Sequence, residues 1–355
     1  MPDTVTSIFR LFRYITFRTA YATISALVIV FLLGPWVIRK LKALKITQVV
    51  REKYLKNHGY KAATPTMGGI IILFALLVST LLWARWDNRF TLIIFGVTMG
   101  FGGLGLVDDY LKMVRRKPEG LVARYKLIGQ FLIAAILAGY LYLNPVGGPE
   151  YSTQLAVPFF DKPPINLGWF YIPFVILVIM GASNAVNLTD GLDGLAIGAV
   201  IFAAIAYTGI AYVTGHYNFS HYLKLTYLSG TGELTVYLGA LIGAGLGFLW
   251  FNTYPAQVFM GDTGSLALGG ALGTVAVLTR HEMLLIIIGG LFVVEALSVV
   301  LQVISYKFRG RRIWLMAPLH HHFELKGWPE PRIVVRFWIL AGIFTLLSLS
   351  TLKLR

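Results

Sequence analysis

The chain has 355 residues, no cysteine and few charged residues. The lack of cysteine excludes disulfides and thiolate metal sites, although it does not identify the compartment. Charged residues make up only 13% and hydrophobic residues 57%, whereas a soluble domain carries roughly 25% charged residues. Together with a mean hydropathy of +0.71, this composition predicts a polytopic membrane protein. No polar stretch is long enough to form a soluble domain, so residues 1–355 are expected to form a single integral membrane domain.

Acidic residues are also scarce. There are 16 Asp and Glu against 31 Lys and Arg, which gives a formal net charge of +15. In a membrane protein such an excess bears on topology and on anionic ligands more than on nucleic acid. A nucleic-acid partner is therefore not expected.

Long apolar runs dominate what is present. Crossing the hydrocarbon takes roughly 17–25 apolar residues, and the runs do not alternate with the period of two that a membrane β-barrel requires. We therefore predict an all-α protein with about ten transmembrane helices. The first run ends at Arg39-Lys40 without a small-residue cleavage site, so it is read as a retained span and not as a signal peptide. The ten predicted spans are Ala20–Ile38, Met67–Ala84, Phe90–Val107, Leu127–Leu143, Trp169–Val186, Leu195–Val213, Leu234–Phe251, Ser265–Thr279, Met283–Ser305 and Ile333–Leu352.

The basic residues predict the orientation of these spans. Most of the Lys and Arg residues lie in one alternating set of loops. These loops connect the first span to the second, the third to the fourth and the ninth to the tenth. The positive-inside rule makes this set cytoplasmic and both termini periplasmic. The two long loops on the other side, residues 144–168 and 214–233, are read as short connectors.

Five acids lie in three clusters at the ends of apolar runs, on the predicted cytoplasmic side: Asp108-Asp109, Asp190 with Asp193, and Asp262. A charge near the bilayer centre costs roughly 2.5–3.5 kcal/mol on insertion scales, so acids at membrane spans need water, a metal or a substrate to compensate them. Adjacent carboxylates such as Asp108 and Asp109 repel each other and require a cation or a shared proton. We expect the clusters to meet around one hydrated pocket.

Two polar loops carry the other acids. In Asn187-Leu-Thr-Asp-Gly-Leu-Asp-Gly194, the glycines let the backbone approach a ligand closely. The Asn and Asp side chains supply acceptor oxygens for a sugar, a base or a metal. A simple capped turn and a transporter-like cation site remain open for this loop. In the loop that begins at Asn252, Asp262 can cap a helix or ligate a metal through oxygen. Phe259 in that loop fits packing and base stacking equally well.

Basic and imidazole side chains are the remaining candidates. His320, His321 and His322 cannot all face one ion from a helix, so a three-His zinc site is not expected, and a loop of imidazoles beside arginines fits phosphate binding better. Lys61, Thr66 and Lys126 lie just before spans and are candidates for the pocket edge. Glu295 lies within the ninth span, where pairing with polar groups inside the bundle is favoured over catalysis.

Carboxylates beside basic residues suit a Mg²⁺-bridged, strongly anionic substrate, since Mg²⁺ prefers one or two carboxylates with waters and phosphate oxygens. The residues alone thus indicate phosphoryl transfer to or from a lipid phosphate. The rival class is a transporter, but transporter sites lie near the midplane between repeated halves, and these acids gather at one face.

Several segments resemble the bacterial phospho-N-acetylmuramoyl-pentapeptide transferases of the polyprenyl-phosphate N-acetylhexosamine-1-phosphate transferase superfamily. The resemblance runs from about Thr64 to the C-terminus, and its most specific segment separates this branch from relatives that use UDP-N-acetylglucosamine. The matching segments are Thr64-Pro-Thr-Met-Gly-Gly69, Gly105-Leu-Val-Asp-Asp-Tyr110, Asn187–Gly194, Val258-Phe-Met-Gly-Asp-Thr-Gly-Ser265 and, most specific, Met316-Ala-Pro-Leu-His-His-His-Phe-Glu-Leu-Lys-Gly-Trp-Pro-Glu330.

The resemblance implies a Mg²⁺-dependent transferase at the cytoplasmic face of the bacterial inner membrane. Phospho-N-acetylmuramoyl-pentapeptide would pass from UDP to undecaprenyl phosphate, giving lipid I and UMP in the first membrane step of peptidoglycan synthesis. A sister transferase that uses UDP-N-acetylglucosamine is the alternative, and a homodimer is a family expectation. A single displacement and a covalent aspartyl intermediate use the same residues, so the number of chemical steps stays open.

The resemblance also implies residue roles. Asp262 would bind Mg²⁺, and Asp108 and Asp109 would serve the lipid phosphate as base or anchor. The nucleotide pocket would be lined by Asn187, Asp190, Asp193, Asn252, Phe259 and Lys126. Phosphates or the sugar would be held by Lys61, Thr66, His320, His321 and His322.

Overall fold

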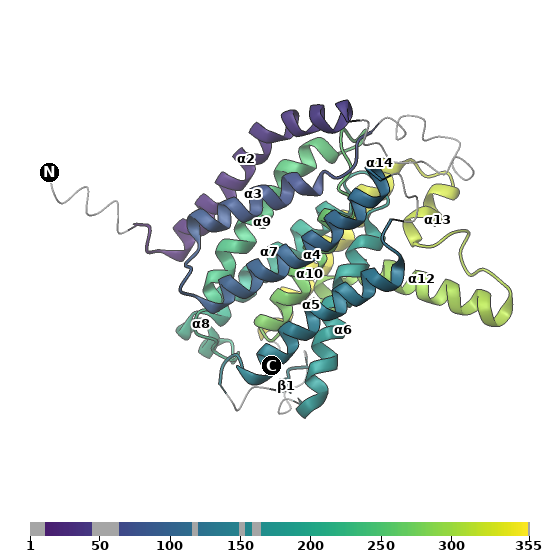
Figure 1. Cartoon of the computed structure of the whole chain (residues 1–355). Helices are drawn as coiled ribbons and strands as arrows, with labels where there is room; N and C mark the ends of the chain where they lie inside the picture. The colour runs from purple at the N-terminus through teal and green to yellow at the C-terminus, as the bar shows by residue number, and fades with distance from the viewer. Residues whose placement is uncertain (1–10, 45–63, 116–119, 149–152, 158–164, 354–355) are drawn as a thin grey trace.

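Long helices run side by side through most of the chain, and α12 projects from the bundle at one end (Figure 1). This computed structural model describes residues 11–44, 64–115, 120–148, 153–157 and 165–353. The long helices are α2 Ile15–Ala43, α3 Gly69–Trp83, α4 Arg89–Met113, α5 Ala123–Leu143, α6 Tyr171–Thr189, α7 Leu195–Thr214, α9 Leu234–Asn252, α10 Gly261–Leu278, α12 Gly290–Arg309 and α14 Glu330–Ser350.

The short elements lie between these helices. They are helices α8 Tyr217–Tyr222, α11 Leu285–Ile288 and α13 Leu319–Leu325, the 3-10 turns η3 Gly168–Phe170, η4 Thr231–Glu233 and η5 Thr351–Lys353, and the antiparallel strands β1 Gln154–Leu155 and β2 Ile165–Asn166. The strand pair and α8 lie in the two loops predicted to be plain connectors, so those loops carry more local structure than the sequence suggested.

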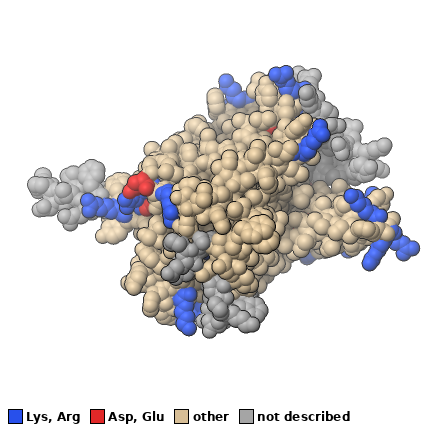
Figure 2. Space-filling view, turned by 60° about the horizontal axis from the view of Figure 1, so that its bottom comes forward, with Lys and Arg blue, Asp and Glu red and all other residues tan. Residues whose placement is uncertain are grey.

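The predicted all-α membrane class is confirmed. Each of the ten predicted apolar runs lies mainly in helix, and eight helices of the described residues are long and apolar enough to cross a membrane. Figure 2 shows a broad face almost free of charge, with Lys and Arg toward its edges. Many large apolar side chains of the described residues are exposed, among them Leu177 and Leu346 at 69% each, as a bilayer rather than water would favour.

Helix α10 corresponds to the eighth predicted span, Ser265–Thr279, and differs from the lipid-exposed helices. Its first turns are polar and glycine-rich, yet every residue from Thr263 to Leu278 is buried. It packs mainly against α4 and α6, and Gly270 leaves room for the ring of Phe101 on α4. A helix enclosed by other helices does not need a strongly apolar lipid-facing surface, so small residues serve it better.

The ninth predicted span, Met283–Ser305, was wrong as one continuous helix. The structure has a short α11, then Gly289 with φ −87° and ψ 19°, and then α12 from Gly290. Two consecutive glycines are the weakest residues for helix propagation, so the chain changes direction there.

Glycines at small-xxx-small spacing in α9 allow close packing against α2. A Cβ on Gly239 would lie 2.9 Å from the Thr19 carbonyl oxygen of α2, and one on Gly247 would lie 2.8 Å from Val30 Cβ. A Cβ on Gly243 would collide with the carbonyl of Thr23. The first span is therefore held by backbone approach along its length.

The predicted orientation can be tested because the native chain has no cysteine. Tyr217→Cys and Arg312→Cys place single thiols at exposed positions on opposite predicted sides. In sealed right-side-out vesicles, a membrane-impermeant maleimide should label the cysteine at position 217 directly. The cysteine at position 312 should react only after permeabilisation. The reverse pattern would invert the topology, and labelling of both before permeabilisation, in vesicles proven sealed, would contradict the predicted separation.

Candidate active site

Four charged side chains form the centre of the site, at the end of α4, the start of α5 and the start of α10. Lys112 Nζ lies 2.6 Å from Asp262 Oδ2 and 3.0 Å from Asp108 Oδ2. Lys126 Nζ lies 2.8 Å and 3.1 Å from the same two oxygens. Two carboxylate oxygens thus share two ammonium groups, and the cluster is balanced in formal charge. Asp108 is 1% exposed, so this compensation takes place largely out of water.

Asp109, the neighbour of Asp108, has a different structural role. Its Oδ1 accepts a hydrogen bond from the backbone N of Asp262 (3.1 Å), and its Oδ2 accepts from the backbone N (2.9 Å) and Oγ1 (2.6 Å) of Thr263. These are N–H groups in the first turn of α10, which have no partner within their own helix. Asp109 therefore caps α10 from α4, where its negative charge also faces the positive end of the helix dipole.

The two helices approach closely enough for this cap because Gly105 has no side chain. A Cβ at Gly105 would collide with the Asp262 carbonyl oxygen. Asn187, at the end of α6, completes the surroundings of Asp262. Its Nδ2 donates to Asp262 Oδ1 at 2.6 Å and to Ser265 Oγ at 2.7 Å. One Asp262 oxygen thus faces an amide and the other faces the two ammonium groups.

Sequence reasoning did not select Lys112, which lies at the middle of the cluster. The signal was present, because Lys112 follows Asp108 by four residues on α4 and such pairs face each other on a helix. The side chain of Lys112 is 29% exposed against 16% for Lys126, so it is the more accessible of the two cations.

Two further predicted residues lie beside the cluster. Burial, helped by the charges of Asp262 and Asp109, raises the pKa of Asp190 to about 8, so this carboxyl is largely protonated at neutral pH and can donate a hydrogen bond. Thr66 is buried, and a Cβ on Gly261 would lie 3.2 Å from its Oγ1 and 2.7 Å from Asp109 Oδ2. Gly261 has φ +74°, a conformation that suits glycine. Lys61 lies outside the described residues.

The side chains of Asp193 and Asn252 make hydrogen bonds that connect neighbouring loops. Asp193 Oδ2 accepts from the backbone N of Ala256 at 2.9 Å. Asn252 Oδ1 accepts from Gly194 N at 3.0 Å, and its Nδ2 donates to Val258 O at 2.8 Å. Both side chains are buried. In this structure they fix the shape of the pocket, and a direct contact with nucleotide stays a prediction.

Phe259 is anchored through its backbone. Its N donates to Pro65 O at 2.8 Å, and its carbonyl accepts from Gly68 N at 2.8 Å. The residue itself is only partly buried. A ring on a fixed backbone with one accessible side is suited to stacking on a base, the second of its two predicted uses.

The three histidines lie on helix α13, so the prediction of a loop was wrong. Pro318 precedes the first turn, where its fixed φ suits the start of a helix. The ring centroids of His320 and His321 lie 4.2 Å apart, but the three side chains have different hydrogen-bond partners. His320 is fully buried against Glu295, His321 Nδ1 lies 2.6 Å from Glu324 Oε2, and His322 Nδ1 accepts from Leu315 N at 3.1 Å.

The donor set of the cluster fits a hard divalent cation. No group of three or more His, Cys, Asp or Glu residues within the described ranges is arranged to hold a metal. However, Asp108 Oδ2 and Asp262 Oδ2 both lie within 3.1 Å of each lysine Nζ, so the two oxygens already converge on positions where positive charge is favourable. Two carboxylates with oxygen ligands from water and phosphate match the preference of Mg²⁺.

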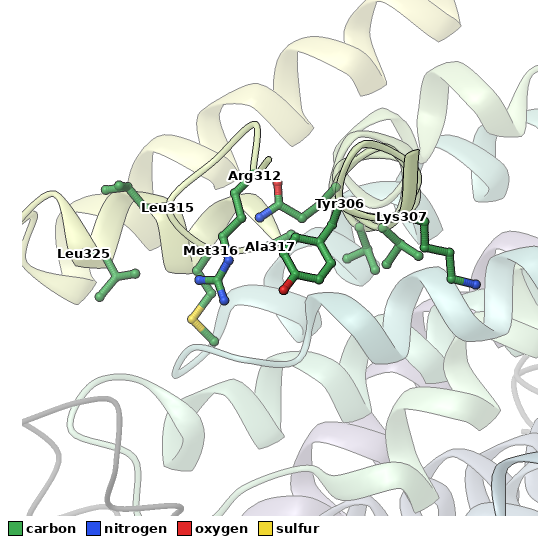
Figure 3. Close-up of a pocket in the computed structure, with 10 residues that line it drawn as sticks. Tyr306, Lys307, Arg312, Leu315, Met316, Ala317 and Leu325 are labelled. Atoms are coloured by element: carbon green, nitrogen blue, oxygen red, sulfur yellow. The ribbon is translucent and has the colours of Figure 1, made fainter. Parts of the chain in front are cut away.

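A separate pocket of about 480 Å³ lies at the far end of α12 (Figure 3). It is formed by α12, the segment that leads to α13, and Leu325, and it contains none of the predicted site residues. In Figure 3, the polar ends of Arg312 and Tyr306 point to the same side, near Met316, whereas Lys307 points away. The pocket is mainly apolar with a cationic edge, as suits the boundary between lipid tails and headgroups.

Comparison with known proteins agrees with this site. A family model described as glycosyl transferase family 4 matches residues 91–280, more than half of the chain, and the match includes all four residues of the central cluster. The chain is thus a member of that class. Proteins named phospho-N-acetylmuramoyl-pentapeptide-transferase from Pelobacter propionicus, Citrifermentans bemidjiense and Geobacter sp. strain M21 are 54%, 55% and 55% identical to it, over 98% of this chain and 96% of each relative. The chain belongs to the phospho-N-acetylmuramoyl-pentapeptide-transferase family.

The role of Asp109 as a helix cap predicts a loss of stability. Asp109→Ala removes the acceptor for three hydrogen bonds at the start of α10, and loss of a cap costs about 0.5–2 kcal/mol. The melting temperature in detergent should fall by a few degrees. Thr263→Val, which removes only the hydrogen bond of the hydroxyl, should lower the melting temperature by less than half as much as Asp109→Ala does. If Thr263→Val destabilises the protein as much as Asp109→Ala does, the backbone cap is not what holds α10.

Proposed function

We propose that this chain transfers phospho-N-acetylmuramoyl-pentapeptide from its UDP carrier to undecaprenyl phosphate, giving lipid I and UMP. The observation that carries the proposal is the cluster of Asp108, Asp262, Lys112 and Lys126 at one end of a membrane bundle. The name shared by relatives that are 54–55% identical over almost the whole chain supplies the substrates. The site faces the cytoplasm in this proposal, at the inner membrane of a bacterium, where a soluble nucleotide sugar and a lipid phosphate can meet.

The reaction exchanges one phosphoanhydride for another. An oxygen of the lipid phosphate bonds to the phosphorus attached to the sugar, the bond from that phosphorus to the UMP oxygen breaks, and UMP leaves with the electron pair. The atoms balance without any other reactant. There is little covalent chemistry for the protein to perform in phosphoryl transfer, so positioning and charge neutralisation account for most of the catalysis.

Three phosphate groups meet in this reaction, and the chain offers the cations to offset them. Lys112 and Lys126 have flexible side chains, are not fully buried and already lie together. They can move from the carboxylates to phosphate oxygens when substrate binds. Asp262, with Asp108 beside it, would hold Mg²⁺, which would supply further positive charge to offset the negative charge of the phosphates. The amide of Asn187 keeps Asp262 oriented through its second oxygen.

Recognition of the nucleotide would use the neighbouring groups. Asp190 can hydrogen-bond to the base or to a hydroxyl of the sugar, and the partly exposed Phe259 can stack on the base. Asp193 and Asn252 would act by holding the two loops that present these side chains.

The decisive test measures UMP release by the purified protein with undecaprenyl phosphate and each of two sugar donors. UDP-N-acetylmuramoyl-pentapeptide should give UMP and lipid product only with Mg²⁺, and chelation should abolish the reaction. The rate of UMP release by Asp262→Asn should be about 100-fold or more below that of wild type, because several kcal/mol of charge stabilisation are lost. Turnover of UDP-N-acetylglucosamine instead would favour the sister transferase. Solute uptake by proteoliposomes without UMP release would favour a transporter.

Lys112 should be as necessary as the residues selected from sequence. Lys112→Met keeps the length and apolar stem of the side chain but leaves two carboxylates with one ammonium group, so turnover should fall at least about tenfold. The matched control is Arg115→Met, which removes an exposed cation three residues further along the chain. Arg115→Met should stay within about twofold of wild type. Equal effects of the two variants would show that only the general positive charge matters.

A further inference from the structure

A buried carboxylate–imidazole pair lies outside the charged cluster, and the proposed chemistry does not use it. Glu295, on α12, and His320, on α13, are both 0% exposed. Glu295 Oε1 accepts from the backbone N of His320 at 3.2 Å, and Oε2 lies 3.2 Å from His320 Nδ1. One carboxylate thus holds both the backbone and the ring of His320. A charged residue within a membrane-spanning helix is costly and is normally kept for a function.

The other ring nitrogen of His320 points at the loop between α6 and α7. A Cβ on Gly191 would collide with His320 Nε2, and its three nearest heavy atoms would all belong to this one ring. Gly191 is not among the glycines with positive φ. The requirement for glycine here therefore comes from the imidazole and not from the backbone conformation. Gly191 lies between Asp190 and Asp193, so the ring sits directly against the loop that carries both acids.

The Glu295 contact also decides which nitrogen of His320 carries the proton. A carboxylate accepts hydrogen bonds, so Nδ1 is the protonated nitrogen and Nε2 keeps a lone pair. Burial lowers the pKa of His320, and the ring is neutral. Nε2 has no hydrogen-bond partner within the part of the chain that the structure describes. A neutral ring fixed in this way acts as a spacer of defined shape.

The same loop is fixed from its other sides. The backbone N of Asp193 donates to Glu330 Oε1 at 2.8 Å, and the carbonyl of Gly194 accepts from Trp338 Nε1 at 3.2 Å. Both partners lie on α14. The ring of His320 supplies the support at Gly191, which these contacts leave open. Of the loop contacts named here, the one through His320 depends on α12, which carries Glu295.

We propose that Glu295 is a positioning residue: by fixing His320 against Gly191, it sets the place of the loop Asp190–Gly194 and thereby the affinity of the site for the nucleotide sugar. The inference rests on the proposed function. A residue in the first half of the lipid-facing helix α12 then controls the nucleotide side of the reaction and not the lipid side.

Kinetics with both substrates varied provide the first test. In Glu295→Ala, KM for UDP-N-acetylmuramoyl-pentapeptide should rise about tenfold or more, the range that groups in one contact network show, while KM for undecaprenyl phosphate changes less than about threefold. Glu295→Gln, which keeps the size and one acceptor, should lie between wild type and Glu295→Ala. Gln302→Ala is the control, since Gln302 lies two turns further on α12 and holds the backbone of Ile313 and Trp314 instead. A rise in both KM values, or an equal effect of Gln302→Ala, would overturn the proposal.

A double-mutant cycle tests the path through the ring. Gly191→Ala alone should raise the same KM, because its Cβ displaces His320 from the opposite side. In Gly191→Ala with Glu295→Ala, the untethered ring can move away, so the double variant should resemble Glu295→Ala alone. Effects that multiply would show that the two residues act independently and would contradict the proposal.

A spectroscopic readout separates this inference from the proposed function. The chain has seven histidines, and ring ¹⁵N spectra compared with those of His320→Asn identify the signal of His320. Wild type should show a neutral ring with the proton on Nδ1, and Glu295→Ala, which removes both acceptor oxygens, should lose that state. If the tautomer depends on Glu295 but UDP-N-acetylmuramoyl-pentapeptide is not turned over, the proposed function fails and the positioning contact stands. An unchanged tautomer in Glu295→Ala would remove the contact itself.

Discussion

The structure of the site depends on charge compensation between two carboxylates and two ammonium groups in a place with little water. Asp108 and Asp262 come from different helices and would repel each other if left alone, and an uncompensated buried charge typically destabilises a protein by about 3–5 kcal/mol. Lys112 and Lys126 remove that repulsion by lying between the same two oxygens. The four side chains therefore hold three helices together and keep an anion-binding set of cations in one place. Stability and readiness for a phosphate-rich substrate come from the same contacts.

Adjacent acids can serve different purposes because consecutive helical residues point in different directions. Asp108 faces the lysines, whereas Asp109 faces the start of α10 and fixes the backbone from which Asp262 projects. A strip of backbone hydrogen bonds continues this link, with Gly69 N donating to Met260 O at 2.7 Å and Gly68 N to Phe259 O. The segment before α3, the end of α4 and the start of α10 thus form one rigid frame. A frame of this kind is what phosphoryl transfer requires, because small displacements of the cations are costly to the rate.

Much of the fold was predictable from sequence because hydropathy is a local property. All ten apolar runs are helical, and the acids placed on one side by counting spans do meet. The failures concern properties that depend on tertiary contacts. The change of direction at Gly289, the helix under His320 and the cation at Lys112 become clear only when the packing of α4, α12 and α13 is known. Asp193 and Asn252 were expected from their motifs to line the nucleotide pocket, but sequence could not show that their side chains hold neighbouring loops.

The packing around Glu295 explains why an acid, which is energetically costly in a membrane helix, lies on α12. The same helix exposes Leu297, Leu301 and Ile304 at 46–50%, so α12 would be cheaper to place in a membrane without an acid. The carboxylate is retained on the opposite side, where it holds the backbone and the ring of His320. That ring in turn supports a loop from a different part of the chain. Because α12 begins at Gly290, directly after the helix break at Gly289, a contact that fixes its inner face also fixes the position of the nucleotide loop relative to this lipid-facing helix.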